Sequence, residues 1–221
     1  MTKTTQMSFF EEQLPDMDRY LESHASAEPD ILKRLRKETY QKTTQPHMIS
    51  GYLQGRLLSL ISKILAPSSI LEIGTFTGYS TLCLAEGLAS AGKITTLDKN
   101  EDTALIAEKY FHESEYRNHI EFKKTNAMNY LQNIETKFDL VFIDADKENY
   151  LNYFQLLKPL THSGSVLLFD NVLWYGKVLE EKPKLESTRA IQELNAAVSK
   201  DSHFDNVILP LRDGINLLRR K

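Results

Sequence analysis

Two short segments hold acidic and amide side chains in positions where they could bind a metal ion. Residues 142–150 read FIDADKENY and residues 169–176 read FDNVLWYG, and each segment closes a short apolar run. If those runs are adjacent parallel strands, their carboxyl ends meet, and Asp144, Asp170 and Asn171 converge as three oxygen ligands. Two carboxylates and one amide suit a hard cation such as Mg²⁺, Mn²⁺ or Ca²⁺. The alternative is that the acids only cap helices, but the presence of both motifs favours the metal site.

Lys147 follows Asp144 by three residues and is a candidate general base. A metal ion that binds a hydroxyl oxygen lowers the pKa of that hydroxyl, and a lysine beside the ion can accept the proton if the ion lowers its own pKa. Asp144 and Lys147 are therefore the expected catalytic residues. Open positions on the ion would take water or two adjacent hydroxyls of a substrate. Without the metal site, Lys147 would be an ordinary surface residue, and Trp174 could either wall the substrate or pack in the core.

A glycine-containing segment, LEIGTFTGYS at residues 71–80, lies where an apolar run meets a helical stretch. Glycines there let the backbone turn tightly and approach a ligand closely. The spacing is G-x-x-x-G and differs from the G-x-G-x-x-G of dinucleotide-binding folds. Glu72 within the segment would repel a pyrophosphate but suit a cation, so the ligand should carry an amine or a sulfonium. The alternative is an ordinary strand-to-helix turn.

Two further strand ends complete a nucleoside site. Asp98 lies 26 residues after Glu72, where a carboxylate can accept both hydroxyl hydrogens of a ribose. The next run is followed by Thr125-Asn126-Ala127, where a small residue can lie beside an adenine ring. Three strand ends then fit a nucleoside with a positively charged tail, which is S-adenosylmethionine. Asp98 alone could equally be a carboxylate at a helix N-terminus.

The elements that must position these residues alternate from about residue 50 onward. Short apolar runs rich in branched or aromatic residues predict buried parallel strands at Ile70–Ile73, Ile94–Leu97, Ile120–Phe122, Leu140–Ile143 and Val166–Phe169. Amphipathic stretches between them predict helices, among them Ser80–Ser90, Asp102–Glu115 and Asn149–Leu157. The result is an α/β fold with a doubly wound sheet and helices on both faces.

The chain closes with a hairpin signal. Val207–Leu211 and Ile215–Leu218 are strand-like and are joined by the turn candidate Arg212-Asp213-Gly214, so the last two strands should be antiparallel. A seven-stranded, mostly parallel sheet that ends in such a hairpin is the Rossmann-like outline of class I methyltransferases. The first fifty residues are polar and helical in pattern, and Pro29–Thr44 is predicted to be an added helix over the active site or a partner subunit.

Composition excludes several other classes. The 221 residues suffice for a single domain, 1–221, in which 1–47 would be an N-terminal helical extension. The net charge of −3 gives no strong attraction to nucleic acid, although a basic patch from Lys33, Arg34, Arg36, Lys37 and the terminal Arg219, Arg220 and Lys221 remains possible.

The N-terminal residues 1–14 lack the apolar core of a signal peptide, and no apolar run exceeds four residues. With Cys83 as the only cysteine, a soluble, cytoplasmic protein is expected.

Residues from about Met48 to the C-terminus resemble the cation-dependent O-methyltransferases of the catechol and caffeoyl-coenzyme A type. The motifs LEIGTFTGYS, FIDADKENY, FDNVLWYGKV and LPLRDGINLLRRK carry the resemblance. It implies a homodimer, metal ligation by Asp144, Asp170 and Asn171, and Lys147 as general base. It also implies cofactor contacts from Glu72, Gly74, Thr75, Ser80, Asp98, Ala127, Asp144 and Asp146, with Met48, Ile49 and Ser50 at the mouth of the pocket.

Two departures concern the acceptor. Val207 is the nearest position to a glutamate that holds one substrate hydroxyl in the mammalian catechol enzyme, so that contact is absent. Tyr175 replaces the asparagine of plant caffeoyl-coenzyme A enzymes and the common glycine of bacterial ones, and together with Trp174 and Lys147 it would shape the acceptor site. The leading hypothesis is methylation of a small catechol-like or phenylpropanoid hydroxyl. The alternatives are methylation of hydroxyuridine in transfer RNA and a non-catalytic subunit that binds S-adenosylmethionine.

Overall fold

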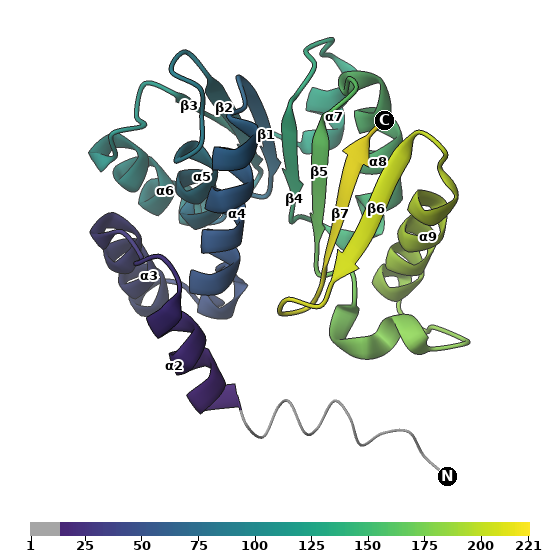
Figure 1. Ribbon diagram of the computed structural model, residues 1–221, viewed down its shortest axis with the longest axis horizontal. Coiled ribbons are helices and arrows are strands. Elements are labelled where there is room, and N and C mark those ends of the chain that lie inside the picture. The colour runs from purple at the N-terminus through teal and green to yellow at the C-terminus, as the bar shows by residue number, and fades with distance from the viewer. Residues whose placement is uncertain (1–13) are drawn as a thin grey trace.

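A seven-stranded sheet forms the centre of the computed structural model, which describes residues 14–221 (Figure 1). The strand order is β3-β2-β1-β4-β5-β7-β6, in which β1 to β5 are parallel and β7 is antiparallel to both β5 and β6. The strands are β1 Ser69–Ile73, β2 Lys93–Asp98, β3 Ile120–Lys124, β4 Leu140–Ile143, β5 Val166–Asp170, β6 Phe204–Leu209 and β7 Ile215–Arg220. The predicted fold class, including the C-terminal hairpin, is therefore confirmed.

The apolar runs become the central strands because both of their faces are covered. Every residue of β4 and β5 is buried, as expected for strands with continuous rather than alternating apolar sequence. In contrast, β6 at the edge of the sheet exposes four of its six residues, Asp205 to Ile208. The two central strands end at Ile143 and Asp170, so both acidic segments begin at the same edge of the sheet.

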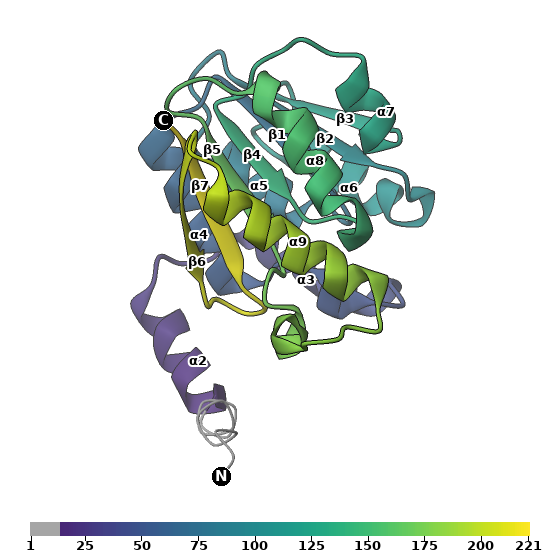
Figure 2. The same ribbon diagram turned by 90° about the vertical axis from the view of Figure 1, so that its right-hand side faces the viewer.

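Helices form a layer on each face of the sheet (Figure 2). One core cluster joins the sheet to α3 Asp30–Lys42, α4 Tyr52–Leu65, α5 Tyr79–Ala85 and α6 Glu101–Glu113. The other joins the opposite face to α7 Ala127–Gln132, α8 Tyr150–Leu157 and α9 Glu186–Lys200. Short 3₁₀ turns complete the chain: η1 Pro46–Met48, η2 Lys147–Asn149, η3 Lys158–Leu160 and η4 Trp174–Leu179.

The helix over Ser80–Ser90 is shorter than the sequence pattern indicated, since α5 ends at Ala85. Beyond it the chain turns at Gly87, where a Cβ atom would lie 2.2 Å from the carbonyl carbon of Ser62 on α4. The close backbone contact between this turn and α4 leaves no room for another helical turn. The helix expected at Asn149–Leu157 begins at Tyr150, after the η2 turn.

The described N-terminal part consists of α2 Leu14–His24 and α3 Asp30–Lys42, and α3 confirms the helix expected at Pro29–Thr44. Leu32 and Leu35 of α3 are buried in the same core cluster as Ile70 of β1. The sequence expectation that residues 1–14 do not form a signal peptide falls almost entirely on residues 1–13, which lie outside the described residues. Within 14–221, no helix has the length and apolar character needed to cross a membrane.

Candidate active site

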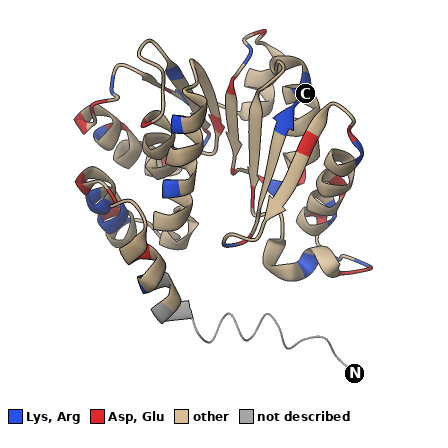
Figure 3. Ribbon diagram, in the orientation of Figure 1, with Lys and Arg blue, Asp and Glu red and all other residues tan. Residues whose placement is uncertain are grey.

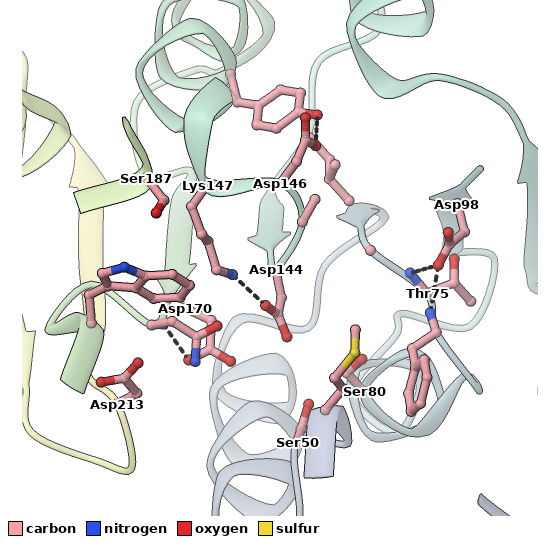
Figure 4. Close-up of a pocket in the computed structure, with 18 of the residues that line it drawn as sticks. Ser50, Thr75, Ser80, Asp98, Asp144, Asp146, Lys147, Asp170, Ser187 and Asp213 are labelled. Atoms are coloured by element: carbon pink, nitrogen blue, oxygen red, sulfur yellow. Dashed lines mark hydrogen bonds and ion pairs between the residues drawn. The ribbon is translucent and has the colours of Figure 1, made fainter. Parts of the chain in front are cut away.

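A cavity of about 960 Å³ opens at the carboxyl ends of β1, β2, β4 and β5 (Figure 4). It lies where the strand order reverses between β1 and β4, which is the place where open α/β sheets bind ligands. Of the residues that the sequence assigned to the site, all except Glu72 line this cavity. They are Met48, Ile49, Ser50, Gly74, Thr75, Ser80, Asp98, Ala127, Asp144, Asp146, Lys147, Asp170, Asn171, Trp174 and Tyr175.

Gly74 brings the ends of β1 and β4 into backbone contact. Its φ is +104°, and a Cβ atom placed there would lie 1.9 Å from the carbonyl oxygen of Asp144. Gly78 has φ +88° and is the N-cap residue directly before α5, and a Cβ atom there would lie 2.5 Å from the ring of Phe111. Both positions therefore require glycine, and the first of them fixes Asp144 beside the glycine-containing turn.

Glu72 lies beneath the cavity and does not line it, contrary to the contact that the resemblance implied. The side chain is fully buried and accepts hydrogen bonds from the hydroxyls of Thr81 and, at 2.6 Å, Thr96. Burial raises the pKa of Glu72 to about 7. In this structure Glu72 ties β1 to β2 and to α5, so it supports the turn from below.

Asp98 holds the turn after β1 to the end of β2. Its Oδ2 accepts hydrogen bonds from the backbone N–H of Thr75 at 3.1 Å and of Phe76 at 2.7 Å (Figure 4). The alternative role as a helix-capping carboxylate does not apply, because Asn100 caps α6 by accepting from the N–H of Asp102. Asp98 Oδ1 accepts one hydrogen bond, from the N–H of Asn100 at 2.9 Å, and keeps one lone pair, so the expected ribose contact stays a prediction.

Asp146 and Ala127 lie on the next part of the wall. Burial alone would raise the pKa of Asp146, but hydrogen bonds from Tyr153, at 2.7 Å, and from Asn149 lower it below its ordinary range. Ala127 begins α7, which Asn126 caps by accepting from the N–H of Asn129 at 3.2 Å. The wall therefore combines a carboxylate that stays ionised with a small apolar residue.

The expected metal ligands Asp144, Asp170 and Asn171 come together in the cavity at the ends of β4 and β5. Asp170 is 2% exposed. Its Oδ2 accepts from Gln54 Nε2 at 2.6 Å, and its Oδ1 accepts from the N–H of Asn171 at 2.8 Å. Burial, with the nearby negative charge of Asp144, raises the pKa of Asp170 well above its ordinary range. Neither carboxylate caps a helix through its side chain, so that alternative fails.

The donor set fits a hard cation. Two carboxylates whose negative charges repel each other in a mostly buried site gain stability when a cation lies between them. Their partner Asn171 has φ +58°, a conformation that asparagine tolerates better than most residues, at the end of β5. Among residues 14–221 there is no cluster of three or more histidine, cysteine, aspartate or glutamate side chains that could hold a metal. The proposed set contains only two such side chains, together with an amide.

Lys147 is 9% exposed and lies beside the predicted ligands (Figure 4). Its Nζ donates to Asp144 Oδ1 at 2.8 Å and to the hydroxyl oxygen of Tyr150 at 2.6 Å. The Tyr150 hydroxyl in turn donates to the carbonyl oxygen of Asp170 at 2.9 Å. Lys147 is thus a buried amine held at the cavity wall, which is unlike an ordinary surface lysine.

η4 forms the side of the cavity next to the β6–β7 turn. Trp174 lines the cavity and also packs against the core cluster of the α8–α9 layer, so the expected core packing is confirmed and the role as a substrate wall stays a prediction. Tyr175 lies at the rim with 74% of its surface exposed. Val207 lies on β6 opposite Leu217 and does not line the cavity, in keeping with the absent glutamate contact. Asp213 from the β6–β7 turn lies on this side instead, and its Oδ1 accepts from the N–H of Tyr175 at 2.6 Å.

Sequence reasoning missed several residues that support the site: Gln54, Tyr150, Tyr153, Arg212 and Asp213. Tyr150 and Tyr153 carried a local signal, because they follow Lys147 at helical spacing and can face the same strand ends. Gln54 carried none, since it precedes its partner Asp170 by 116 residues. Arg212 and Asp213 were assigned only to a turn.

The fold and the site define a Rossmann-like methyltransferase with its ligand cavity at the carboxyl edge of the sheet. The O-methyltransferase family matches residues 22–221. Caffeoyl-CoA O-methyltransferase 3 of Nicotiana tabacum is 37% identical over 205 residues, which cover 87% of this chain and 84% of that protein. The O-methyltransferase from Bacillus cereus, solved in complex with SAH, has a TM-score of 0.88 and 28% identity and covers 95% of this chain and 99% of its own. An SAH-bound methyltransferase from Podospora anserina has a TM-score of 0.87, 26% identity and 96% coverage of both chains.

The chain therefore belongs to the O-methyltransferase family and is an enzyme of the S-adenosylmethionine-dependent class. The predicted family and enzyme class are confirmed.

Proposed function

We propose that this enzyme is a divalent-cation-dependent O-methyltransferase whose acceptor is a small molecule with two adjacent hydroxyls, catechol-like or phenylpropanoid and similar to caffeoyl-CoA. The observation that carries the proposal is the placement of Asp144. Its carboxylate contacts the buried Lys147 at 2.8 Å and lines the same cavity as Asp170 and Asn171. A candidate base thus lies directly beside a candidate cation site.

S-adenosylmethionine, when bound, supplies the electrophilic methyl group. The side of the cavity formed by β1 and β2 suits its nucleoside, with Asp98 for the ribose and Ala127 beside the adenine. Asp146, which lines the cavity and whose pKa is lowered, favours a positively charged tail. Met48, Ile49 and Ser50 close the mouth, and Gly74, Thr75 and Ser80 line the turn. The SAH that accompanies two related structures supports this assignment.

Asp144, Asp170 and Asn171 would hold Mg²⁺, with Mn²⁺ and Ca²⁺ as other candidates because all three prefer oxygen ligands. The cation, when bound, supplies Lewis acidity that lowers the pKa of an acceptor hydroxyl. The neutral amine of Lys147 would accept the hydroxyl proton on its lone pair, since Nζ lies at the cavity wall within hydrogen-bond distance of Asp144. Trp174 forms an aromatic wall and Tyr175 limits the width of the entrance.

The test is a methyl-transfer screen with catechols, caffeoyl thioesters and hydroxyuridine-containing tRNA, with and without divalent ions. We expect turnover of a catechol or caffeoyl thioester that disappears with chelator and returns with Mg²⁺ or Mn²⁺. Asp170→Ala should abolish turnover and leave S-adenosylhomocysteine binding within a few-fold of wild type. Full turnover after removal of divalent ions would contradict the cation dependence. Absence of any methyl transfer by the cation-loaded protein would favour a non-catalytic subunit that binds S-adenosylmethionine.

The charge distribution favours a small acceptor over tRNA. Basic residues gather on α3 (Figure 3), but four of the five are already paired. The pairs are Lys33–Asp30, Arg34–Glu113, Arg36–Glu28 and Lys42–Glu38. Paired cations displace fewer counterions from a phosphate backbone. A filter-binding titration should therefore show weak tRNA binding, whereas tight binding with a steep salt dependence would support the tRNA alternative.

The proposal includes a homodimer, a single domain with residues 1–47 as its extension, and a cytoplasmic location. Exposed apolar side chains support the dimer, with Leu60 and Ile64 on α4 exposed by 56% and 73% and Val207 on edge strand β6 by 49%. The lone, buried Cys83 suits a reducing compartment. Light scattering should give a mass of two chains for the wild type, and Ile64→Glu should shift it toward one.

A further inference from the structure

A buried glutamine joins the candidate metal site to the turn between β6 and β7. Gln54 on α4 is 1% exposed, and its Nε2 donates to Asp170 Oδ2 at 2.6 Å. At the other end of the amide, Oε1 accepts from Arg212 Nη1 at 3.4 Å. Three side chains from α4, the end of β5 and the hairpin turn therefore form one hydrogen-bonded chain.

The chemistry of the two ends fixes how the middle residue is oriented. A guanidinium only donates hydrogen bonds and an ionised carboxylate only accepts them. The side chain between Arg212 and Asp170 must accept at one end and donate at the other, as an amide does. Because the Gln54 amide cannot rotate freely between these partners, it holds one oxygen of Asp170 in place. The N–H of Asn171 holds the other oxygen at 2.8 Å, and both oxygens keep free lone pairs for a cation.

Arg212 also organises the mouth of the cofactor cavity. Nη1 donates its two hydrogens to the carbonyl oxygens of Ile49, at 2.8 Å, and of Ser50, and shares them with Gln54 Oε1 at 3.4 Å. Nη2 donates to the carbonyl oxygen of His47 at 3.3 Å. His47, Ile49 and Ser50 line the cavity. One guanidinium thus binds three backbone carbonyls that lie more than 160 residues earlier in the sequence. The segment 47–50 has no regular structure beyond the η1 turn, so Arg212 is its main polar anchor.

We propose that Arg212 and Gln54 are positioning residues, which form a relay that aligns Asp170 for the cation and fixes the cofactor mouth at the same time. The inference rests on the proposed cation site. The new element is that two side chains outside the set of proposed ligands orient the carboxylate of Asp170. Partners that orient metal ligands commonly change metal affinity by 10-fold to 100-fold when they are removed.

The test is direct binding of Mn²⁺, measured by electron paramagnetic resonance or calorimetry on the full chain, with S-adenosylhomocysteine binding measured in parallel. Gln54→Met keeps the size of the side chain and removes both hydrogen bonds, and we expect Mn²⁺ to bind about tenfold more weakly. Arg212→Ala should weaken Mn²⁺ binding by about threefold to tenfold and should also weaken S-adenosylhomocysteine binding. The double variant should bind Mn²⁺ no more weakly than Gln54→Met alone, because both changes break one relay.

The direction in which Arg212→Ala changes the affinity for Mn²⁺ distinguishes the relay from a purely electrostatic effect. Removing a positive charge near a cation site tightens cation binding through space, whereas breaking the relay weakens it. Arg219→Ala, which removes the same charge from an exposed site on β7, is the matched control and should leave both affinities within twofold. Arg212 lies on an exposed turn, so its variant decides the question even if Gln54→Met fails to fold.

Two outcomes overturn the inference in different ways. If wild type binds Mn²⁺ and Arg212→Ala binds it equally or more tightly, the relay is wrong and the proposed function stands. If wild type binds S-adenosylhomocysteine but no divalent ion, the cation site fails and the relay fails with it.

Discussion

Lys147 Nζ lies 2.6 Å from the hydroxyl oxygen of Tyr150, which is itself fully buried. The Tyr150 hydroxyl in turn donates a hydrogen bond to the carbonyl oxygen of Asp170 at 2.9 Å. Burial raises the pKa of Tyr150 well above its ordinary value, so this hydroxyl keeps its proton. The candidate base is therefore held by a neutral group that is anchored to the backbone of a candidate metal ligand.

Removing the base and removing its anchor should have separable effects. Lys147→Met eliminates the proton acceptor, and we expect kcat to fall by about 10²- to 10⁴-fold. Tyr150→Phe leaves the amine present but less well oriented, and we expect a fall of about tenfold. Calorimetry should show S-adenosylhomocysteine affinity within threefold of wild type for both variants. Unchanged kcat in Lys147→Met would remove Lys147 from the mechanism.

Gly74 should be far less tolerant of alanine than another glycine with positive φ. At Gly74 the added Cβ would lie 1.9 Å from the Asp144 carbonyl oxygen, whereas at Gly164, with φ +93°, it meets nothing within 4 Å. We expect Gly74→Ala to lower the free energy of unfolding by about 3 kcal/mol or more, and Gly164→Ala by about 1 kcal/mol. Urea denaturation checks both values. Equal losses in the two variants would mean that the strand ends move apart easily.

Stability at acidic pH should depend on Glu38. Hydrogen bonds from Lys109 and Lys42 lower the pKa of this carboxyl from 4.5 to about 2, and Glu38 joins α3 to α6 through Lys109 and Tyr110. A lowered folded-state pKa stabilises the protein above the unfolded-state value, and this contribution is lost as the pH falls from 4.5 toward 2. Glu38→Gln should cost about 1 kcal/mol at pH 7 and nothing near pH 2.

The control for that experiment is Glu181→Gln, an exposed acid in the loop before α9. Thermal unfolding of the two variants and wild type between pH 2 and pH 7 gives the comparison. A stability difference for Glu38→Gln that stays constant over this range would contradict the assignment.

Tyr175 should control which acceptors enter. The residue is 74% exposed at the rim, and its φ of +53° suits glycine better than tyrosine. We expect Tyr175→Gly to raise kcat/KM for a bulky caffeoyl thioester about fivefold relative to a simple catechol. Tyr40→Ala, which removes an exposed tyrosine from α3, should leave that ratio unchanged. A fall in kcat/KM for both acceptors would instead make Tyr175 a part of the binding surface.

The strand-end residues could be predicted because their positions follow from the sheet alone. Asp98, Asp144 and Asp170 each follow an apolar run, and parallel strands bring such ends together. The side-chain partners of these residues could not be predicted, because they depend on packing between distant elements. Gln54 contacts Asp170 because the fold brings α4 to the end of β5, 116 residues further along the chain. Glu72 lies beneath the cavity because the hydroxyls of Thr81 and Thr96 donate to it there.

The backbone contact between Gly74 and Asp144 also bears on how such an enzyme can be redesigned. In the proposed function, this contact joins the residues that would bind the methyl donor to those that would accept the proton. Because it is made by main-chain atoms, it changes little with side-chain substitutions elsewhere. The proposed acceptor wall, η4 at Trp174–Leu179, is a separate segment and includes exposed residues such as Tyr175 and Leu179. We therefore expect that substitutions in η4 change the range of acceptors and leave the relative positions of β1 and β4 at the site unchanged.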